Sequence, residues 1–205
     1  MAPATEHLAP VVLSDTTLRD GEQAPGVAFT ADEKALIATA LVASGIREIE
    51  AGTPAMGGAE IEAIAGVVQS VPEARVIAWC RMTERDVDLA LETGADTLNL
   101  SIPVSALQLK AKFGKGEDYA IEMIRRVVPY ALDHGVRVHI GGEDSSRADV
   151  GFLKRVLETA AEVGAKRFRF ADTLGVLDPF AAFQVLRELS SGTDLELEIH
   201  AHDDL

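Results

Sequence analysis

Two short segments contain most of the residues that could carry out chemistry. The first is residues 15–23, DTTLRDGEQ, in which Asp20 stands next to a glycine turn. The second is residues 200–204, HAHDD. Positions i and i+2 of a strand face the same side, so the imidazoles of His200 and His202 can point at one centre. Two histidines and one carboxylate suit a divalent cation such as Zn²⁺, Mn²⁺ or Fe²⁺.

Each segment also has an ordinary explanation. Residues 15–23 could be a solvated loop in which Arg19 pairs with a neighbouring acid, and residue types alone leave the two interpretations about even. An H-x-H pair is a weak motif and is often only a polar strand end. A nearby carboxylate strengthens the metal hypothesis. In a closed barrel only one strand would separate the strand before Asp20 from the strand of His200 and His202.

Further candidates follow other apolar runs. Glu143 lies in GGEDSSR, where Gly141 and Gly142 would let a substrate approach the backbone, although a serine there could simply cap the next helix. Thr173 lies in FADTLG, and its hydroxyl could bind a carboxylate, although a plain loop turn explains it equally well. The weaker candidates are Glu50, Arg81, His139 and a basic patch at Lys110, Lys112 and Lys115.

The elements that must position these residues form one repeating pattern. Short apolar runs at residues 11–14, 48–51, 76–80, 97–102, 136–140, 167–171 and 195–200 alternate with amphipathic helical stretches. Such alternation predicts parallel βαβ units. Thr30 with Glu33 forms a predicted capping box, Thr83 caps a second helix, and Asp178-Pro179 starts a third.

The predicted fold is an α/β fold, a (β/α)8 TIM barrel that stops here after about seven strands. Chemically useful residues fall at the carboxyl ends of several strands, which is where barrel active sites lie. No G-x-G-x-x-G follows the first run, so a dinucleotide-binding sheet has no support. A barrel needs eight strands and about 250 residues. We therefore expect residues 1–205 to be one incomplete catalytic domain that lacks the eighth unit and a C-terminal region.

Composition narrows the class of protein. The chain is 47% hydrophobic and 25% charged, with a formal net charge of −14 and no basic block. This charge balance argues against nucleic acid as a partner, and no apolar stretch approaches the ~20 residues of a membrane span. The single cysteine, Cys80, excludes an intrachain disulfide and fits a reducing compartment, so we expect a cytoplasmic protein.

Beyond these patterns, the chain resembles a known family. DTTLRDGEQAPGVAFTADEK resembles the signature of the DRE-TIM metallolyases, in the branch of isopropylmalate, citramalate and homocitrate synthases. EIEAGTPAMG, LSIPVS, GGEDSSRAD, RFADTLGVLDPF and HAHDD follow in order and at matching spacing. The resemblance runs from about residue 11 to residue 205 and is greatest to the homocitrate synthases associated with nitrogenase.

The resemblance implies a role for each candidate. It implies that Asp20, His200 and His202 bind the metal and that Arg19 polarises a keto oxygen. Glu50 matches an acid of the catalytic machinery, Glu143 an acid near the substrate, and Thr173 a threonine that holds the carboxylate of a 2-oxo acid. Arg81 stands where related enzymes have a histidine, and His139 replaces a basic residue that contacts the substrate.

The implied activity is a Claisen condensation of acetyl-CoA with 2-oxoglutarate and water, which gives homocitrate and CoA. The implied cofactor is Mg²⁺, Mn²⁺ or Zn²⁺, the implied full-length protein is a homodimer, and the implied role is in nitrogen fixation. Isopropylmalate or citramalate synthesis from another 2-oxo acid is the alternative. So is a catalytically incompetent fragment, because the family completes its site with residues beyond the seventh strand.

Overall fold

The computed structural model describes residues 11–202. The strands are β1 (Ser14–Asp15), β2 (Glu48–Gly52), β3 (Arg75–Arg81), β4 (Thr97–Pro103), β5 (Arg137–Glu143), β6 (Arg167–Asp172) and β7 (Glu196–Ala201). The helices are α1 (Ala31–Ala43), α2 (Gly58–Ser70), α3 (Glu84–Leu91), α4 (Ala106–Phe113), α5 (Glu117–Asp133), α6 (Val150–Glu162) and α7 (Pro179–Ser190). Short 3-10 turns lie at Gly21–Gln23, Pro54–Met56 and Ser145–Arg147.

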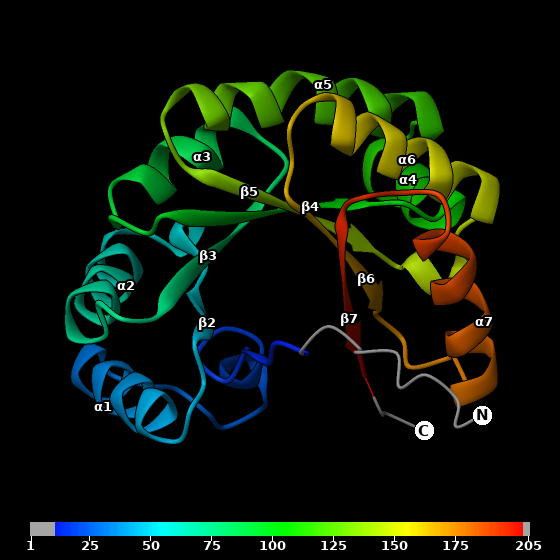
Figure 1. Ribbon diagram of the computed structural model, residues 1–205. Coiled ribbons are helices and arrows are strands. Elements are labelled where there is room, and N and C mark those ends of the chain that lie inside the picture. Colours follow the sequence, from blue (N-terminus) through cyan, green and yellow to red (C-terminus); the bar gives the residue numbers. More distant parts are fainter. Residues whose placement is uncertain (1–10, 203–205) are drawn as a thin grey trace, which may run out of the picture.

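The seven strands form one parallel sheet whose spatial order is the order of the sequence. The sheet curves strongly, the helices cover its outer face, and β7 comes back toward the β1 side (Figure 1). Among residues 11–202, β1 pairs with β2 alone and β7 pairs with β6 alone. The predicted parallel barrel is therefore confirmed as an open barrel of seven strands.

The predicted helix starts are confirmed by their hydrogen bonds. Thr30 and Glu33 form the capping box of α1, and the Thr83 side chain accepts from the N–H of Asp86 at the start of α3. Asp178 caps α7, with Pro179 in its first turn. These caps fix where each helix begins and so set the lengths of the loops at the carboxyl ends of the strands.

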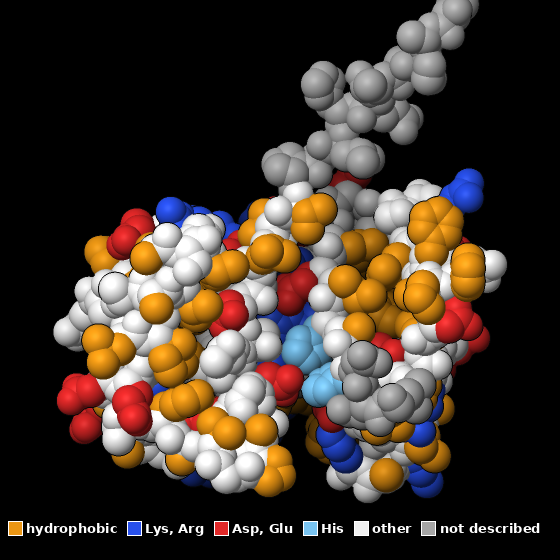
Figure 2. All heavy atoms as spheres, turned by 90° about the horizontal axis from the view of Figure 1, so that it is seen from below, with side chains coloured by type: hydrophobic (Ala, Val, Ile, Leu, Met, Phe, Trp, Pro, Cys, Tyr) orange, Lys and Arg blue, Asp and Glu red, His pale blue; other side chains and the backbone are white. Residues whose placement is uncertain are grey.

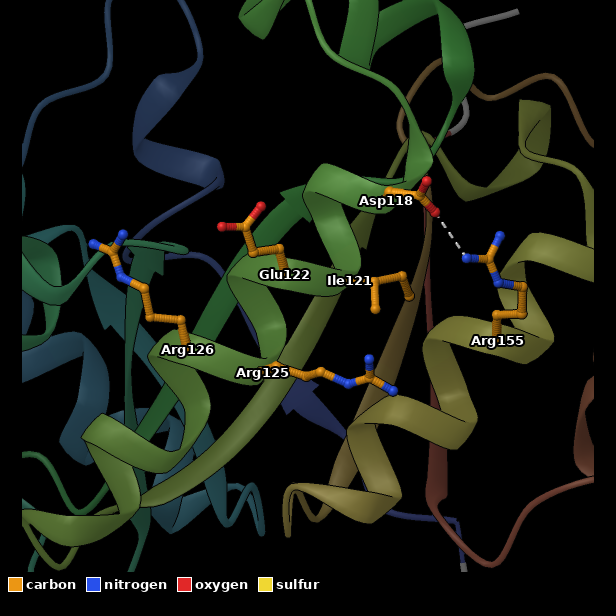
Figure 3. A pocket seen from close by; sticks show the side chains of 6 residues that line it. All are labelled: Asp118, Ile121, Glu122, Arg125, Arg126 and Arg155. Atoms are coloured by element: carbon orange, nitrogen blue, oxygen red, sulfur yellow. Dashed lines mark hydrogen bonds and ion pairs between the residues drawn. The ribbon is translucent and has the colours of Figure 1, made fainter.

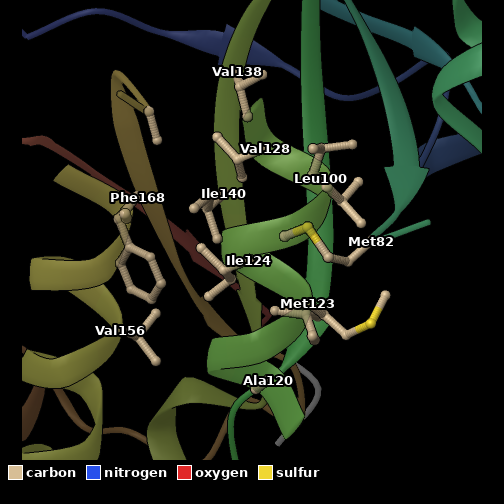
Figure 4. Close-up of a cluster of buried hydrophobic side chains, with 14 of the residues drawn as sticks. Met82, Leu100, Ala120, Met123, Ile124, Val128, Val138, Ile140, Val156 and Phe168 are labelled. Carbon is tan, nitrogen blue, oxygen red and sulfur yellow. The ribbon is translucent and has the colours of Figure 1, made fainter. Parts of the chain in front are cut away.

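Strand alternation separates an apolar outer face from a polar interior. On β4, Leu98, Leu100 and Ile102 are buried in the main core cluster, while Asn99 and Ser101 alternate with them and face the inside of the barrel. Figure 4 shows the core between sheet and helices, where Ile124 and Val128 of α5 approach the strands. The main core is thus outside the barrel, and the interior is left for polar groups.

The first strand differs from its prediction. It pairs with β2 only at Ser14 and Asp15, not over residues 11–14. Val11, Val12 and Leu13 are 87%, 55% and 66% exposed, because no neighbouring strand covers them in the described chain. An apolar run predicts burial against a partner, and within residues 11–202 no such partner covers it.

No helix in the described part of the chain has the length and hydropathy that crossing a membrane requires.

Candidate functional site

The loop after β1 is a tight, anchored turn. The carbonyl of Thr16 accepts the N–H groups of Arg19, Asp20 and Gly21 at 2.8–3.1 Å. Further along, Glu22 forms an ion pair of 2.7 Å with Lys34 of α1, whose side chain is only 1% exposed. The turn and this buried contact fix the direction in which Arg19 and Asp20 project.

Asp20 meets the two histidines of the β7 end across the open side of the sheet. Its Oδ2 lies 3.5 Å from His200 Nε2 and 3.8 Å from His202 Nε2, and the two Nε2 atoms are 3.2 Å apart. Figure 2 shows histidine side chains beside acidic ones in the hollow between the two halves of the molecule. The sequence motif continues into Asp203 and Asp204, which lie outside the described residues.

These three donor atoms fit a divalent cation. Ligand atoms about 2.1 Å from one cation stand about 3 to 3.5 Å from one another, close to the separations seen here. Burial, together with the charges of Arg169 and Arg19, lowers the pKa of His200 below its ordinary value. A lowered pKa keeps the imidazole neutral, which is the form that binds a metal.

Arg19 is held beside this centre by three partners. Its Nε donates to Glu50 Oε1 at 2.5 Å, its Nη1 donates to Asp20 Oδ1 at 2.9 Å, and its Cζ lies 5.7 Å from the Trp79 ring centre. Burial alone would raise the pKa of Glu50, but the guanidinium groups of Arg169 and Arg19 hold that pKa below its usual range. Glu50 is thus a fully buried anion beneath Arg19.

Thr173 and Glu143 occupy the opposite wall. The Thr173 hydroxyl oxygen accepts the N–H of Asp144 at 2.9 Å. Asp144 is the only non-glycine residue with positive φ in the described chain (63°), and its buried carboxylate binds Ser105 and Arg147. Because the hydroxyl oxygen is engaged as an acceptor, the Thr173 proton is left to be donated elsewhere. Glu143 forms an ion pair with Lys112 of α4.

One hollow of about 300 Å³ joins these groups at the carboxyl ends of the strands. Six of the residues singled out from the sequence line it: Arg19, Asp20, Glu143, Thr173, His200 and His202. Glu50 does not line the hollow but contacts it through Arg19. The structure therefore brings seven of the nine candidates together.

Arg81 and His139 are not brought to this hollow. Position 81 shares the strand face of Trp79, but the Arg81 guanidinium is bound by Asp86 of α3 at 2.7 Å and 2.8 Å, is 61% exposed and does not line the hollow. His139 does face the interior, but it lies one side-chain layer below the hollow, and burial and Arg167 lower its pKa to about 4. Neither residue lines this hollow, so their roles in substrate binding stay predictions.

The two adjacent glycines of β5 have different roles. Gly141 lines the hollow, as the substrate-approach hypothesis requires. Gly142 faces outward, where an added Cβ would lie 2.4 Å from Phe168 Cζ. The serine-cap alternative is wrong: Asp149 caps α6, and the Ser145 hydroxyl donates to the carbonyl of Gly142 instead.

Among the residues that line the hollow and that sequence reasoning did not single out are Trp79, Asn99 and Arg169. Strand alternation could have found Arg169, since residues 167, 169, 171 and 173 share one face and Thr173 was already a candidate. An arginine on an interior position of a strand is itself an unusual signal, because charged side chains are seldom fully buried.

A second hollow, of about 500 Å³, lies outside the barrel between α5 and α6 (Figure 3). Its arginines are all paired with carboxylates: Arg155 with Asp118 at 3.0 Å, Arg125 with Glu162 at 3.4 Å and Arg126 with Glu84 at 2.9 Å. These exposed pairs form a solvated charged face, and no functional residue is assigned there.

The fold and the site define a class of protein: a parallel β/α barrel with a two-histidine, one-carboxylate centre at the carboxyl ends of its strands. Residues 10–205 match the HMGL-like family model, and the chain belongs to this family of DRE-TIM metallolyase domains.

Relatives in the family have several recorded activities. The chain is 47% identical to a homocitrate synthase of Frankia alni over 98% of its own length and 57% of the relative. It is 40% identical to homocitrate synthase subunit alpha of Clostridium pasteurianum, over 93% of this chain and 71% of that protein. A 2-isopropylmalate synthase of Caldanaerobacter subterraneus is 39% identical over 95% of this chain and 51% of the relative. The chain thus spans little more than half the length of most of these relatives.

Solved structures share the fold. The HMG-CoA lyase of Brucella melitensis superposes with a TM-score of 0.78 at 21% identity, over 94% of this chain and 73% of that one. The carboxyl transferase domain of Rhizobium etli pyruvate carboxylase gives a TM-score of 0.73 at 17% identity, over 94% of this chain and 36% of that one. These similarities confirm the TIM-barrel architecture.

Proposed function

We propose that the protein containing these residues is a metal-dependent acyltransferase of the homocitrate synthase type. It condenses acetyl-CoA with 2-oxoglutarate and water to give homocitrate and CoA. The observation that carries the proposal is the convergence of Asp20, His200 and His202 beside Arg19 in a chain 47% identical to a homocitrate synthase. A role in nitrogen fixation and a homodimeric full-length protein remain predictions.

Asp20, His200 and His202 would hold the divalent cation, for which Mg²⁺, Mn²⁺ and Zn²⁺ are the candidates. Such a cation supplies Lewis acidity that makes a keto carbon electrophilic. Arg19 donates hydrogen bonds to the keto oxygen and stabilises the negative charge that develops on it when the acetyl carbon attacks. Glu50 does not touch the substrate, but holds the Arg19 guanidinium in position and stays ionised through its two arginine partners.

The opposite wall orients the organic substrates. Thr173 donates its hydroxyl proton to the carboxylate next to the keto group, because Asp144 already occupies its oxygen. Glu143 is the carboxylate of the hollow that is not assigned to the cation, and it accepts the methyl proton of acetyl-CoA. Lys112 forms an ion pair with Glu143 and fixes the position of its carboxylate.

The alternative function is isopropylmalate or citramalate synthesis, since such synthases are also relatives. All three activities release a thiol from acetyl-CoA, so a thiol assay with 2-oxoglutarate, 2-oxoisovalerate and pyruvate separates them. Release with 2-oxoglutarate alone, abolished by a chelator, supports the proposal. Thiol release mainly with 2-oxoisovalerate or pyruvate would support the alternative function. If the full-length protein released no thiol with any of the three acids, the synthase function would be contradicted.

The 205-residue chain alone is expected to be nearly inactive. Within its described part, both edges of the sheet, β1 and β7, lack a second partner, and Ile199 of β7 is 48% exposed. The same assay on this chain, with the Frankia alni relative as a positive control, tests this expectation. Turnover close to that of the relative would show that the open barrel is already competent.

A further inference from the structure

Arg169 is a buried cation whose hydrogen-bonding capacity is incompletely used. Its side chain is 3% exposed on the interior face of β6. Nε donates to Glu198 Oε1 at 2.6 Å, and Nη1 lies 2.7 Å from Glu50 Oε2 in an ion pair of poor hydrogen-bond geometry. Among the described residues, Nη2 has no hydrogen-bond partner.

An unsatisfied buried donor requires an explanation. Leaving such a group without a partner costs about 1–3 kcal/mol, and more when the group is charged. Arg167, two residues earlier, provides the contrast: both of its Nη atoms bind carboxylates, including Glu48 at 2.6 Å and Glu196 at 2.8 Å. The unsatisfied Nη donors therefore distinguish Arg169 from its neighbour Arg167, and only Arg169 of the two lines the hollow.

The surroundings of Arg169 suit a small anion. Asn99 and Ser101 of β4 and Gly141 of β5 line the same hollow. Gly141 pairs in register with Arg169, and a Cβ there would lie 3.2 Å from Asn99 Oδ1. Because Gly141 has no side chain, it leaves space beside the Arg169 guanidinium. The side chains of Asn99 and Ser101 are polar, so an apolar end of a substrate would find few apolar contacts beside them.

The distance along the strands between Arg169 and the metal-binding histidines matches the length of a five-carbon dicarboxylate. Ala171 pairs in register with His200, so Arg169 lies two residues below the level of the metal-binding histidines. Two residues correspond to about 7 Å along a parallel strand. A five-carbon 2-oxo diacid held at the histidine level by its keto end would extend its far carboxylate into this layer.

We propose that Arg169 is the specificity-determining residue that receives the distal carboxylate of a dicarboxylic 2-oxo acid. The inference rests on the proposed function and extends it to the substrate class. It also replaces Arg81 and His139 as candidates for this contact, since neither reaches the hollow.

The test is the affinity of the full-length protein for two matched ligands, measured by calorimetry with Mn²⁺ present. One is 2-oxoglutarate, and the other is 5-methyl-2-oxohexanoate, in which an isopropyl group replaces the distal carboxylate. The unmodified full-length protein should bind 2-oxoglutarate at least about tenfold more tightly, as one charged hydrogen bond implies. Arg169→Lys keeps the charge beside Glu50 and Glu198 but loses the second Nη, and should remove most of this preference.

Arg167→Lys is the matched control. It changes the same residue type on the same strand face, one layer below the hollow, and should leave both affinities unchanged. Arg169→Met should prefer the apolar ligand, and circular dichroism checks that this variant folds. If Arg169→Met does not fold, the ligand preference of Arg169→Lys decides the test.

The outcomes separate the two proposals. Equal binding of both ligands by the unmodified full-length protein, or an Arg169→Lys variant that keeps the full preference, would overturn the role of Arg169 and leave the 2-oxo acid function standing. Failure of the full-length protein to bind either ligand would overturn both.

Discussion

Asp20 Oδ2 lies 3.5 Å from His200 Nε2, although 180 positions of sequence separate the residues and their strands do not pair. The contact crosses the open side of the barrel. It exists because the curvature of the sheet returns the end of β7 to the loop after β1 (Figure 1). The candidate metal centre therefore depends on the curvature of the whole sheet, which brings its two edges together at their carboxyl ends.

Replacing Asp20 by Asn should lower the affinity for divalent cations by at least about tenfold, because the charged ligand is lost while the shape is kept. Titration with Mn²⁺ or Zn²⁺ followed by calorimetry measures this. Asp32→Asn, an exposed change in the first turn of α1, is the control and should leave the affinity unchanged. Equal affinities for all three chains would remove Asp20 from the metal centre.

Replacing Thr173 by Val should weaken 2-oxoglutarate binding by about tenfold or more, since one hydrogen bond to a charged group is lost. The same change leaves the N–H of Asp144 without its acceptor. Thr173→Ser retains the hydroxyl and should retain most of the affinity. A serine variant as weak as the valine variant would indicate that the methyl group matters, and not the hydroxyl.

Replacing Lys34 by Met should destabilise the fold by about 3–5 kcal/mol, because it leaves Glu22 and Glu60 as uncompensated charges in a mostly buried place. Urea unfolding measures the change. Lys154→Met breaks an exposed pair with Glu188 and should cost less than about 1 kcal/mol. Similar losses in the two variants would show that burial does not strengthen the Lys34 contacts.

His139 should make the fold lose stability as the pH falls. Its pKa is about 4 in the folded state and about 6.5 when unfolded, so below pH 6.5 the unfolded chain takes up a proton that the folded chain does not. The stability contributed by neutral His139 is full above pH 6.5 and declines down to about pH 4, by roughly 3 kcal/mol in total.

His139→Gln should reduce the dependence of the unfolding free energy on pH between pH 6.5 and about pH 4. His134→Gln, an exposed position at the end of α5, should leave the slope as it is. Identical slopes in the unmodified chain and in His139→Gln would mean that His139 is not the group responsible.

Two glycine substitutions should act in opposite directions. Gly142→Ala places a Cβ 2.4 Å from Phe168 Cζ and 2.7 Å from Ser145 Oγ, and overpacking of this kind costs about 1–3 kcal/mol. Gly58→Ala, in the first turn of α2 with open space around it, should stabilise the fold by about 0.5–1 kcal/mol. Thermal unfolding compares both with the unmodified chain, and a shift of the same sign in both would contradict the steric explanation.

The sequence by itself determined the elements and the class of chemistry. Period-two apolar runs and capping residues such as Thr30 and Asp178 act within a few residues, so their consequences can be predicted locally. The same is true of the H-x-H pair, because strand alternation alone aligns His200 with His202. The family resemblance follows from motifs of this local kind.

Only the tertiary structure decided which of the charged residues share a space. Arg81 and His139 have the right chemical type, but Asp86 holds the guanidinium of Arg81, and His139 lies one layer below the hollow. Arg169, the first residue of the RFADTLGVLDPF motif but not a candidate in the sequence analysis, lines the hollow with a donor still unsatisfied. The physical reason is that strand tilt and register, which depend on the packing of the whole sheet, set the depth of each interior side chain.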